Sequence, residues 1–386
     1  MPEIFLRIMT VITIILVSGY AVFILFIILG WLKMRNQKLA PEFSANVSII
    51  IPARNEETNI IPCLESFYAQ EYPADRFEII VVDDNSTDNT GVIIREFAEE
   101  KKKIPVRLIT NTRSENCTNP KRNALMTGIL ESRGDLIITT DADCIVKSTF
   151  LKTVAGFQDK TGSVLTAGSV LSREGATLFS RIQALDYAAL TGVAAGSSGM
   201  GKPLFCSWAN LSFRKKEFFE AGGLDGLDRI KSGDDVFLMF RMKIKYPGRI
   251  HYIADPQASV YTQPERTLKT FLNQRSRWAS KGIHYTDPFL ITVSALVFLC
   301  NLSLLLFFPV SLFNNSVIIL FTLLFILKSV PDFILLTLVT GHFNIRNLLW
   351  VFLPAQIFHV FYVTFAVFKG LSGSYTWKER NPLQGS

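Results

Sequence analysis

The stretch Phe77-Glu-Ile-Ile-Val-Val-Asp-Asp-Asn-Ser-Thr-Asp88 decides the fold. Its first six residues are mostly β-branched and apolar, which is typical of a buried strand, and acidic turn residues follow at once. Similar short apolar runs occur at residues 47–52, 106–109 and 136–139. Helical patterns lie between them at 57–70, 87–103 and 121–132. Strands that alternate with helices predict an α/β domain whose mainly parallel, Rossmann-like sheet is covered on both faces.

Acidic pairs lie at the predicted carboxyl ends of these strands, where such sheets bind their ligands. Asp83 and Asp84 follow the second strand, and Asp141 and Asp143 follow the fourth. Asp83 and Asp84 can accept hydrogen bonds from a base and a ribose. Alternatively they begin a turn, although the polar residues at 86–88 can cap the next helix without them.

Asp141 and Asp143 predict a metal site. In extended backbone, side chains two positions apart point the same way, so both carboxylates can converge on one point. Converging carboxylates repel each other unless a cation neutralises them, and hard oxygen ligands suit Mg²⁺ or Mn²⁺ bound to substrate phosphates. The alternative is a polar turn at the end of a strand, because a single Asp-x-Asp is a common pattern.

Two further segments each have a functional and a structural interpretation. Asp234 and Asp235 begin a predicted helix, where the helix dipole favours acids, but either could also serve as a general base. In Gln274-Arg-Ser-Arg-Trp278, arginines could neutralise a diphosphate and the indole could stack on a sugar. The same segment is equally typical of a basic, aromatic helix at a membrane surface.

The ends of the chain predict membrane helices. The sequence is 49% hydrophobic, and residues 8–32, 288–327 and 348–368 contain no charged side chain. A segment of this length can cross a bilayer, and we interpret 8–32 as an uncleaved anchor rather than a signal peptide. Lys33, Arg35 and Lys38 follow the first segment and predict a cytoplasmic central domain. Lys328, Pro331 and Asp332 interrupt the apolar pattern of 317–339, which leaves one kinked span and a re-entrant pair as alternatives.

Composition excludes several other classes of protein. Five cysteines without CxxC spacing and four histidines without HExxH spacing give no disulfide framework and no zinc site. We expect the cysteines to be reduced and mostly buried. The net charge of +7 is modest and gives no reason to expect nucleic-acid binding.

Five segments in this order resemble the motif set of the family 2 glycosyltransferases, an inverting group with a GT-A fold that includes cellulose, hyaluronan and ceramide glucosyl transferring enzymes. The resemblance covers about residues 45–282, and the flanking apolar segments fit the family's integral-membrane members. The motifs are Pro52-Ala-Arg-Asn-Glu56, Asp83-Asp84, Asp141-Ala-Asp143, Asp234-Asp235 and Gln274-Arg-Ser-Arg-Trp278. The chain departs from the family at the base motif, where Asp234 stands in place of the usual Glu.

The resemblance implies a role for each matching residue. Donor-nucleotide binding is implied for Pro52, Arg54, Glu56, Asp83, Asp84, Lys121 and Asp141. Metal ligation is implied for Asp143, with Asp141 beside it, and general-base catalysis for Asp235, with Asp234 as its neighbour. Contacts to the acceptor and the diphosphate are implied for Asn210, Gln274, Arg275, Arg277 and Trp278.

The predicted organisation has five parts. They are a transmembrane anchor at 1–36, a cytoplasmic GT-A domain at 37–266, an amphipathic interfacial helix at 267–288, a region of two or three transmembrane spans at 289–370, and a tail at 371–386. The predicted protein lies in the cell's inner or plasma membrane. It moves a sugar from a nucleotide-diphosphate donor to a membrane lipid or glycan, with Mg²⁺ or Mn²⁺. The alternatives are a processive polysaccharide synthase and, outside the enzymes, an inactive membrane scaffold.

Overall fold

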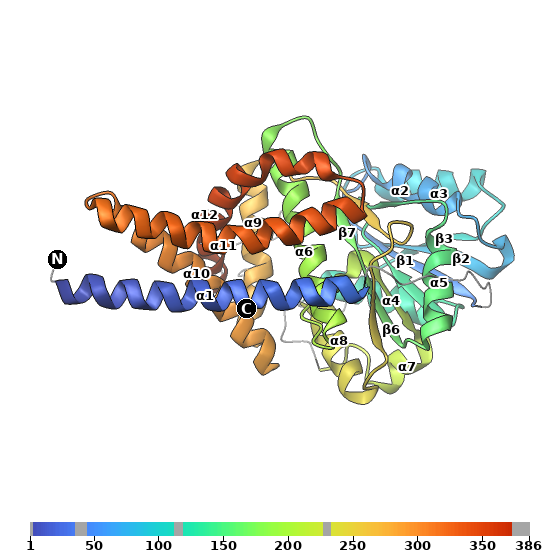
Figure 1. Ribbon diagram of the computed structural model, residues 1–386. Coiled ribbons are helices and arrows are strands. Elements are labelled where there is room, and N and C mark those ends of the chain that lie inside the picture. Colours follow the sequence, from blue (N-terminus) through green and yellow to red (C-terminus); the bar gives the residue numbers. More distant parts are fainter. Residues whose placement is uncertain (1–2, 35–44, 112–118, 227–232, 373–386) are drawn as a thin grey trace. The chain divides into compact units, whose positions relative to one another are not determined.

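A computed structural model describes residues 3–34, 45–111, 119–226 and 233–372 (Figure 1). The predicted basic residues Arg35 and Lys38, the thiol of Cys117 and nearly all of the tail lie outside these residues. The chain divides into two compact units. One, the α/β unit, comprises Met34–Arg173 and Pro203–Gln263; the other, the helical unit, comprises Met1–Lys33, Glu174–Lys202 and Pro264–Ser386.

A seven-stranded sheet in the order β3-β2-β1-β4-β8-β6-β9 forms the centre of the α/β unit. Neighbouring strands are parallel except at β8, which runs antiparallel to both β4 and β6. The strands are β1 (Val47–Ala53), β2 (Phe77–Asp83), β3 (Val106–Thr110), β4 (Leu136–Thr139), β6 (Leu165–Gly168), β8 (Leu211–Arg214) and β9 (Ile250–Ile253). A smaller sheet in the order β5-β10-β7 contains β5 (Ile145–Val146), β7 (Val170–Ser172) and β10 (Val260–Thr262). The predicted α/β class with a mostly parallel sheet is confirmed.

Side chains of β1 alternate between the two covered faces of this sheet. Ile49 and Ile51 lie in a buried apolar cluster that also contains side chains of α2, α3 and α5. Ile50 faces α4 on the other side, where a Cβ on Gly128 would lie 2.5 Å from its Cγ2. This period of two buries both faces of the strand, as expected beneath two helical layers. The helices of the unit are α2 (Ile60–Tyr68), α3 (Thr90–Glu100), α4 (Pro120–Glu131), α5 (Phe150–Thr161), α7 (Lys215–Glu220) and α8 (Asp234–Lys245), with 3₁₀ turns η1 (Ala74–Arg76) and η2 (Trp208–Asn210).

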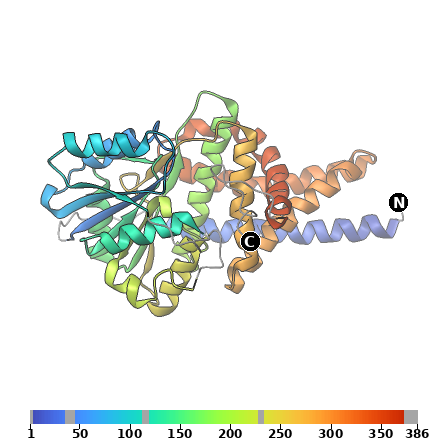
Figure 2. The same cartoon turned by 180° about the vertical axis from the view of Figure 1, so that it is seen from behind.

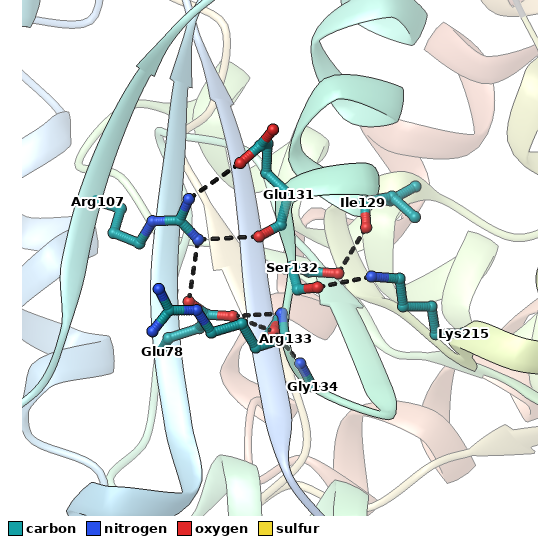
Figure 3. A network of polar contacts seen from close by, with 9 residues as sticks. Glu78, Arg107, Ile129, Glu131, Ser132, Arg133, Gly134 and Lys215 are labelled. Carbon is teal, nitrogen blue, oxygen red and sulfur yellow. Dashed lines mark hydrogen bonds and ion pairs between the residues drawn. The ribbon is translucent and has the colours of Figure 1, made fainter.

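Polar residues at the amino-terminal edge of the parallel strands are bonded to one another (Figure 3). Glu78 is buried, and its carboxylate accepts from the Arg133 backbone N–H at 2.7 Å and the Ser48 hydroxyl at 2.8 Å. Arg107 pairs with Glu78 at 3.4 Å and with Glu131 at 3.1 Å. Because every oxygen of the buried Glu78 carboxylate is engaged, we interpret this network as support for the sheet rather than as a site.

Among the residues that the structure describes, the helical unit contains four helices that are long and apolar enough to cross a membrane. They are α1 (Glu3–Met34), α10 (Pro288–Ser311), α11 (Asn315–His342) and the stretch formed by η4 (Arg346–Val351) and α12 (Phe352–Leu371). Figures 1 and 2 show α10 and α11 as neighbours that run in opposite directions. The region around Pro331 forms one continuous helix, not a re-entrant pair. The unit also contains α6 (Leu178–Gly199), α9 (Leu268–Ala279) and the 3₁₀ turn η3 (Ser280–His284).

The grouping of α6 with the membrane-type helices differs from the predicted boundary of the catalytic domain, which placed residues 174–202 inside 37–266. The boundaries at 36, 266, 288 and 370 stay predictions, as does the placement of α9 along a bilayer surface.

Candidate active site

Two sharp turns shape the carboxyl ends of β1 and β2. Asn55 and Asn85 have φ values of 51° and 55°, a left-handed conformation that asparagine tolerates better than most residues. Arg54 joins the two turns, because its Nη1 donates to the backbone oxygens of Asp84 at 2.7 Å and Asn85 at 2.9 Å. The Pro52-to-Glu56 segment and the Asp83-Asp84 pair are therefore adjacent at this edge of the sheet.

Asp83 and Asp84 already serve the local structure. Asp83 Oδ1 accepts from the backbone N–H of Ser86 at 3.0 Å and from its hydroxyl at 2.6 Å. Asp84 is buried, and its Oδ1 accepts from Asn111 at 2.9 Å. Helix α3 begins later than the predicted residue 87, at Thr90, whose N–H donates to Asp88. Both the turn and the ligand-binding interpretations therefore remain compatible with these acids.

Negative charge is concentrated after β4. Burial, followed by repulsion from Asp141 and Glu56, raises the pKa of the Asp143 carboxyl. Thr262 donates to Asp143 Oδ2 at 3.0 Å, and Lys121 forms an ion pair with Asp141. Carboxylates crowded in this way favour binding of a cation.

Helix α4 contacts acids of two separate segments through its amino end. Asn119 caps the helix by accepting from the Arg122 N–H at 3.1 Å, and its Nδ2 donates to Asp234 Oδ2 at 2.8 Å. Lys121, in the first turn, reaches Asp141. The end of β4 and the start of α8 are therefore both joined to one helix terminus.

The base motif begins α8 directly after Gly233, whose φ of 104° favours glycine. Asp234 and Asp235 are both buried. Asp235 Oδ1 accepts from the backbone N–H of Val236 at 2.9 Å, and its backbone oxygen accepts from the Cys206 thiol at 3.2 Å. These contacts fix the pair at the helix start, where the helix dipole stabilises negative charge.

Three other predicted residues have mainly backbone or local contacts. Asn210 is buried in η2, and its Nδ2 donates to the backbone oxygens of Ser169 and Ala258, both at 2.9 Å. Glu56 accepts from Asn59 at 2.8 Å. Pro52 pairs with Val82 in the sheet and is half-buried. Asn210 thus holds two loops together, which was not foreseen from its motif.

The Gln274-to-Trp278 segment lies on α9 in the helical unit. Gln274 donates to Glu265 at 2.9 Å. Arg275 is buried, with 5% of its surface exposed, and pairs with Asp186 of α6 at 2.6 Å. Arg277 and Trp278 are half-buried. The two arginines of this motif are therefore in different environments.

Sequence reasoning missed the partners that orient the acids. Thr262 lies 119 residues from Asp143, and Asn119 lies 115 residues from Asp234, so no local pattern connects them. Asn119 followed by Pro120 does carry a helix-start signal, which would have placed an amide at this edge. Among the described residues no three His, Cys, Asp or Glu side chains are grouped as ligands of a metal, so Asp141 and Asp143 would need oxygens from a substrate or water.

This arrangement, with acids after β1, β2 and β4 of a mostly parallel sheet, is the one expected of a glycosyltransferase with a GT-A fold. The sequence profile of glycosyl transferase family 21 matches residues 11–378. The chain therefore belongs to that family, a family 2-like group of glycosyltransferases, as the motifs predicted.

Related proteins are also glycosyltransferases or sugar-transferring synthases by name. A probable glycosyltransferase YdaM of Bacillus subtilis is 32% identical over 62% of this chain and 55% of its own. A beta-monoglucosyldiacylglycerol synthase of Synechocystis is 26% identical over 61% and 47%, and a poly-beta-1,6-N-acetyl-D-glucosamine synthase of Staphylococcus epidermidis is 24% identical over 61% and 54%. The chain spans about half the length of these curated relatives.

A solved structure shares the fold. The mannosyltransferase PcManGT of Pyrobaculum calidifontis, in complex with GDP-mannose and Mn²⁺, matches 96% of this chain and 100% of its own with a TM-score of 0.60 and 17% identity.

Proposed function

We propose that the protein is a membrane-bound inverting glycosyltransferase that moves one sugar from a nucleotide-diphosphate donor to a hydroxyl of a membrane lipid. The observation that carries the proposal is the amino end of α4, which contacts both Asp141 and Asp234. A donor diphosphate bound beside Lys121 would thereby lie in the same neighbourhood as the base motif. The Synechocystis lipid synthase supports a lipid acceptor.

Asp235 is the proposed general base. It removes the proton from the acceptor hydroxyl as the oxygen attacks the anomeric carbon, and the bond to the nucleoside diphosphate breaks in the same displacement. Asp234 is tied to α4, because Asn119 donates to its Oδ2. We assign Asp234 to fixing the helix start.

Asp143, with Asp141 beside it, would hold Mg²⁺ or Mn²⁺. The fit rests on the crowding of Asp143 by Asp141 and Glu56, which a divalent cation would relieve. The PcManGT complex contains Mn²⁺ and supports the same choice of metal. When bound, the ion would stabilise the charge that develops on the departing diphosphate.

Other side chains of the chain complete the proposed donor and acceptor sites. Lys121 supplies positive charge to the diphosphate, and Asp83 and Asp84 accept hydrogen bonds from the nucleoside. A diphosphate contact of Arg277 stays a prediction from its motif. Trp278 offers its indole to the acceptor. Catalysis then rests mainly on charges that are in place before the reaction begins.

The second candidate is a processive polysaccharide synthase, which the similarity to the Staphylococcus epidermidis synthase favours. A secreting channel has to enclose a polar path, and the described part of the chain offers four apolar helices for it. One transfer to a lipid needs no such path.

The test is a screen of nucleotide sugars with purified protein, membrane lipids as acceptor and mass analysis of the products. We expect one added sugar on an extractable lipid; a long polymer would select the synthase. Asp235→Asn should lower transfer by about 100- to 10,000-fold while donor binding is kept. Asp75→Asn in η1 is the matched control and should behave as the wild type, and near-normal turnover of Asp235→Asn would remove Asp235 from the base role.

A further inference from the structure

Arg275 is buried among polar and aromatic groups of the helical unit. Its Nη2 donates to Asp186 Oδ2 at 2.6 Å and its Nη1 to Gln274 Oε1 at 2.7 Å. The centre of the guanidinium lies 4.1 Å from the Trp278 ring and 4.6 Å from the Phe271 ring. The two terminal nitrogens of the cation are thus hydrogen-bonded and aromatic rings pack against it, whereas its Nε makes no hydrogen bond.

The charge of Arg275 is balanced before any substrate binds. Asp186 is nearly as buried as Arg275, with 10% of its side chain exposed against 5%. Its other oxygen, Oδ1, accepts from the hydroxyl of Tyr362 on α12. Although Arg275 Nε makes no hydrogen bond, a buried ion pair strongly resists loss of either partner, so this arginine is a poor candidate to move onto a diphosphate.

Trp278 depends on the same cluster. Arg275 packs on one indole face, and Tyr187 of α6 meets the ring edge-on with centroids 6.1 Å apart. A guanidinium over a desolvated tryptophan face is among the stronger cation–π contacts. Helix α9 is also held close to α12, because a Cβ on Gly370 would lie 2.7 Å from the backbone oxygen of Ser276. The indole is therefore held on one face by Arg275, whose charge is balanced by Asp186.

We propose that Arg275 is a positioning residue, which Asp186 and Tyr362 hold in place so that its guanidinium supports the indole of Trp278 for the sugar acceptor. This inference rests on the proposed function and changes one part of the sequence prediction, which placed Arg275 at the diphosphate. Arg277 is left as the arginine of this segment for which the motif predicts a donor contact.

The test distinguishes a change in the acceptor KM from a change in the donor KM. Arg275→Lys keeps the charge but loses the flat guanidinium face. We expect it to raise the acceptor KM by about tenfold, the scale of a lost cation–π contact, and to leave the donor KM and acceptor-independent donor hydrolysis unchanged. Trp278→Phe should show the same pattern, and the double variant should be no worse than either single one. Arg277→Lys should raise the donor KM instead, and Lys269→Met, exposed on the same helix, is the control.

A second readout does not need turnover. The chain has 5 tryptophans, so protein labelled with 5-fluorotryptophan gives a ¹⁹F signal for Trp278 that Trp278→Phe identifies. Arg275→Lys and Asp186→Asn should both shift this signal. If the wild-type protein transferred no sugar, the proposed function would fail, and the fluorine signal would still decide whether Arg275 supports Trp278.

A double variant is the control for variants that fail to fold. If single variants fail to fold, Asp186→Leu combined with Arg275→Met removes both charges at similar volume and should restore the fold while keeping the acceptor defect. A donor KM that rises with Arg275→Lys, an unchanged acceptor KM or an unmoved Trp278 signal would each overturn the proposal.

Discussion

Thr262 is the residue whose contact tests the metal proposal most selectively. Its hydroxyl donates to Asp143 Oδ2 and so orients that carboxylate without being a proposed metal ligand itself. Partners of this kind typically contribute about 10- to 100-fold to metal affinity. We expect Thr262→Val to weaken Mn²⁺ binding by that factor, measured by electron paramagnetic resonance with a nucleoside diphosphate present. Thr153→Val, whose hydroxyl donates to the backbone oxygen of Thr149 at the start of α5, should bind Mn²⁺ as the wild type does, and an equal loss in both variants would argue against the site.

His251 gives the α/β unit a dependence on pH. Burial lowers the pKa of this imidazole, whose Nδ1 lies 3.3 Å from the Ser163 hydroxyl. The unfolded chain therefore takes up a proton at a higher pH than the folded protein does. The stability associated with neutral His251 is complete above the ordinary pKa of about 6.5 and is lost as the pH falls below it. Thermal unfolding between pH 8 and 5 should show a smaller acid-side loss in His251→Asn than in the wild type; equal losses would assign the effect to other groups.

The sequence predicts the role of a residue well when its contacts are local and poorly when they join distant parts of the chain. Asp83, Asp141 and Asp235 stand out because each follows a local signal, the end of a strand or the start of a helix. The burial of Arg275 depends on Asp186, which is 89 positions away in a helix with no shared pattern. Residue types at motif positions were therefore predictable, but the environment that separates Arg275 from Arg277 was not.

At the scale of elements, the first four strands and their helices were predictable because each segment has its own pattern of apolar residues. Residues 204–214 have the pattern of a strand, but β8 covers only Leu211–Arg214, since η2 forms before it. Its antiparallel direction had no local signal, because direction is decided by which strands it joins. Residues 177–195 have a helical pattern that predicts α6, but the membership of α6 in the helical unit comes from long-range packing.

Helix α11 is stabilised by a polar cluster inside the helical unit. Lys328 donates to Asp332 at 3.0 Å and to Gln356 of α12 at 2.8 Å, and Tyr20 of α1 donates to Asp332 at 2.9 Å. Three helices are joined by these bonds, so α1 belongs to the folded unit and is more than an anchor. Lys328 is fully buried, which makes removal of its partner costly.

A pair of variants tests this cluster. Lys328→Met alone leaves the Asp332 carboxylate without its cation and should destabilise the unit by about 3–5 kcal/mol. Lys328→Met combined with Asp332→Leu should recover most of that loss, because no buried charge is left uncompensated. Unfolding of the protein in mixed detergent micelles measures both. A double variant as unstable as the single one would mean that the ion pair itself stabilises the bundle.

At the scale of the whole molecule, the side of the membrane on which the α/β unit lies is still a prediction. This prediction rests on the charged residues near the apolar helices. Lys33 lies at the end of α1 and Arg346 between α11 and α12, whereas the turn after α10 contains no charged residue. Basic residues favour the cytoplasmic side. If all four helices cross, the α/β unit and Arg346 lie inside and the turn around Phe313 lies outside.

Single engineered cysteines test this orientation. The four described cysteines are buried, and Cys117→Ser removes the remaining one, so the background is unreactive. We expect Phe313→Cys, 90% exposed between α10 and α11, to react with a membrane-impermeant maleimide in intact cells. Lys216→Cys, on the exposed surface of α7, should react only after the membrane is opened. The reverse pattern would place the α/β unit outside, away from cytoplasmic nucleotide sugars, and the donor would then have to be one that is available on that side.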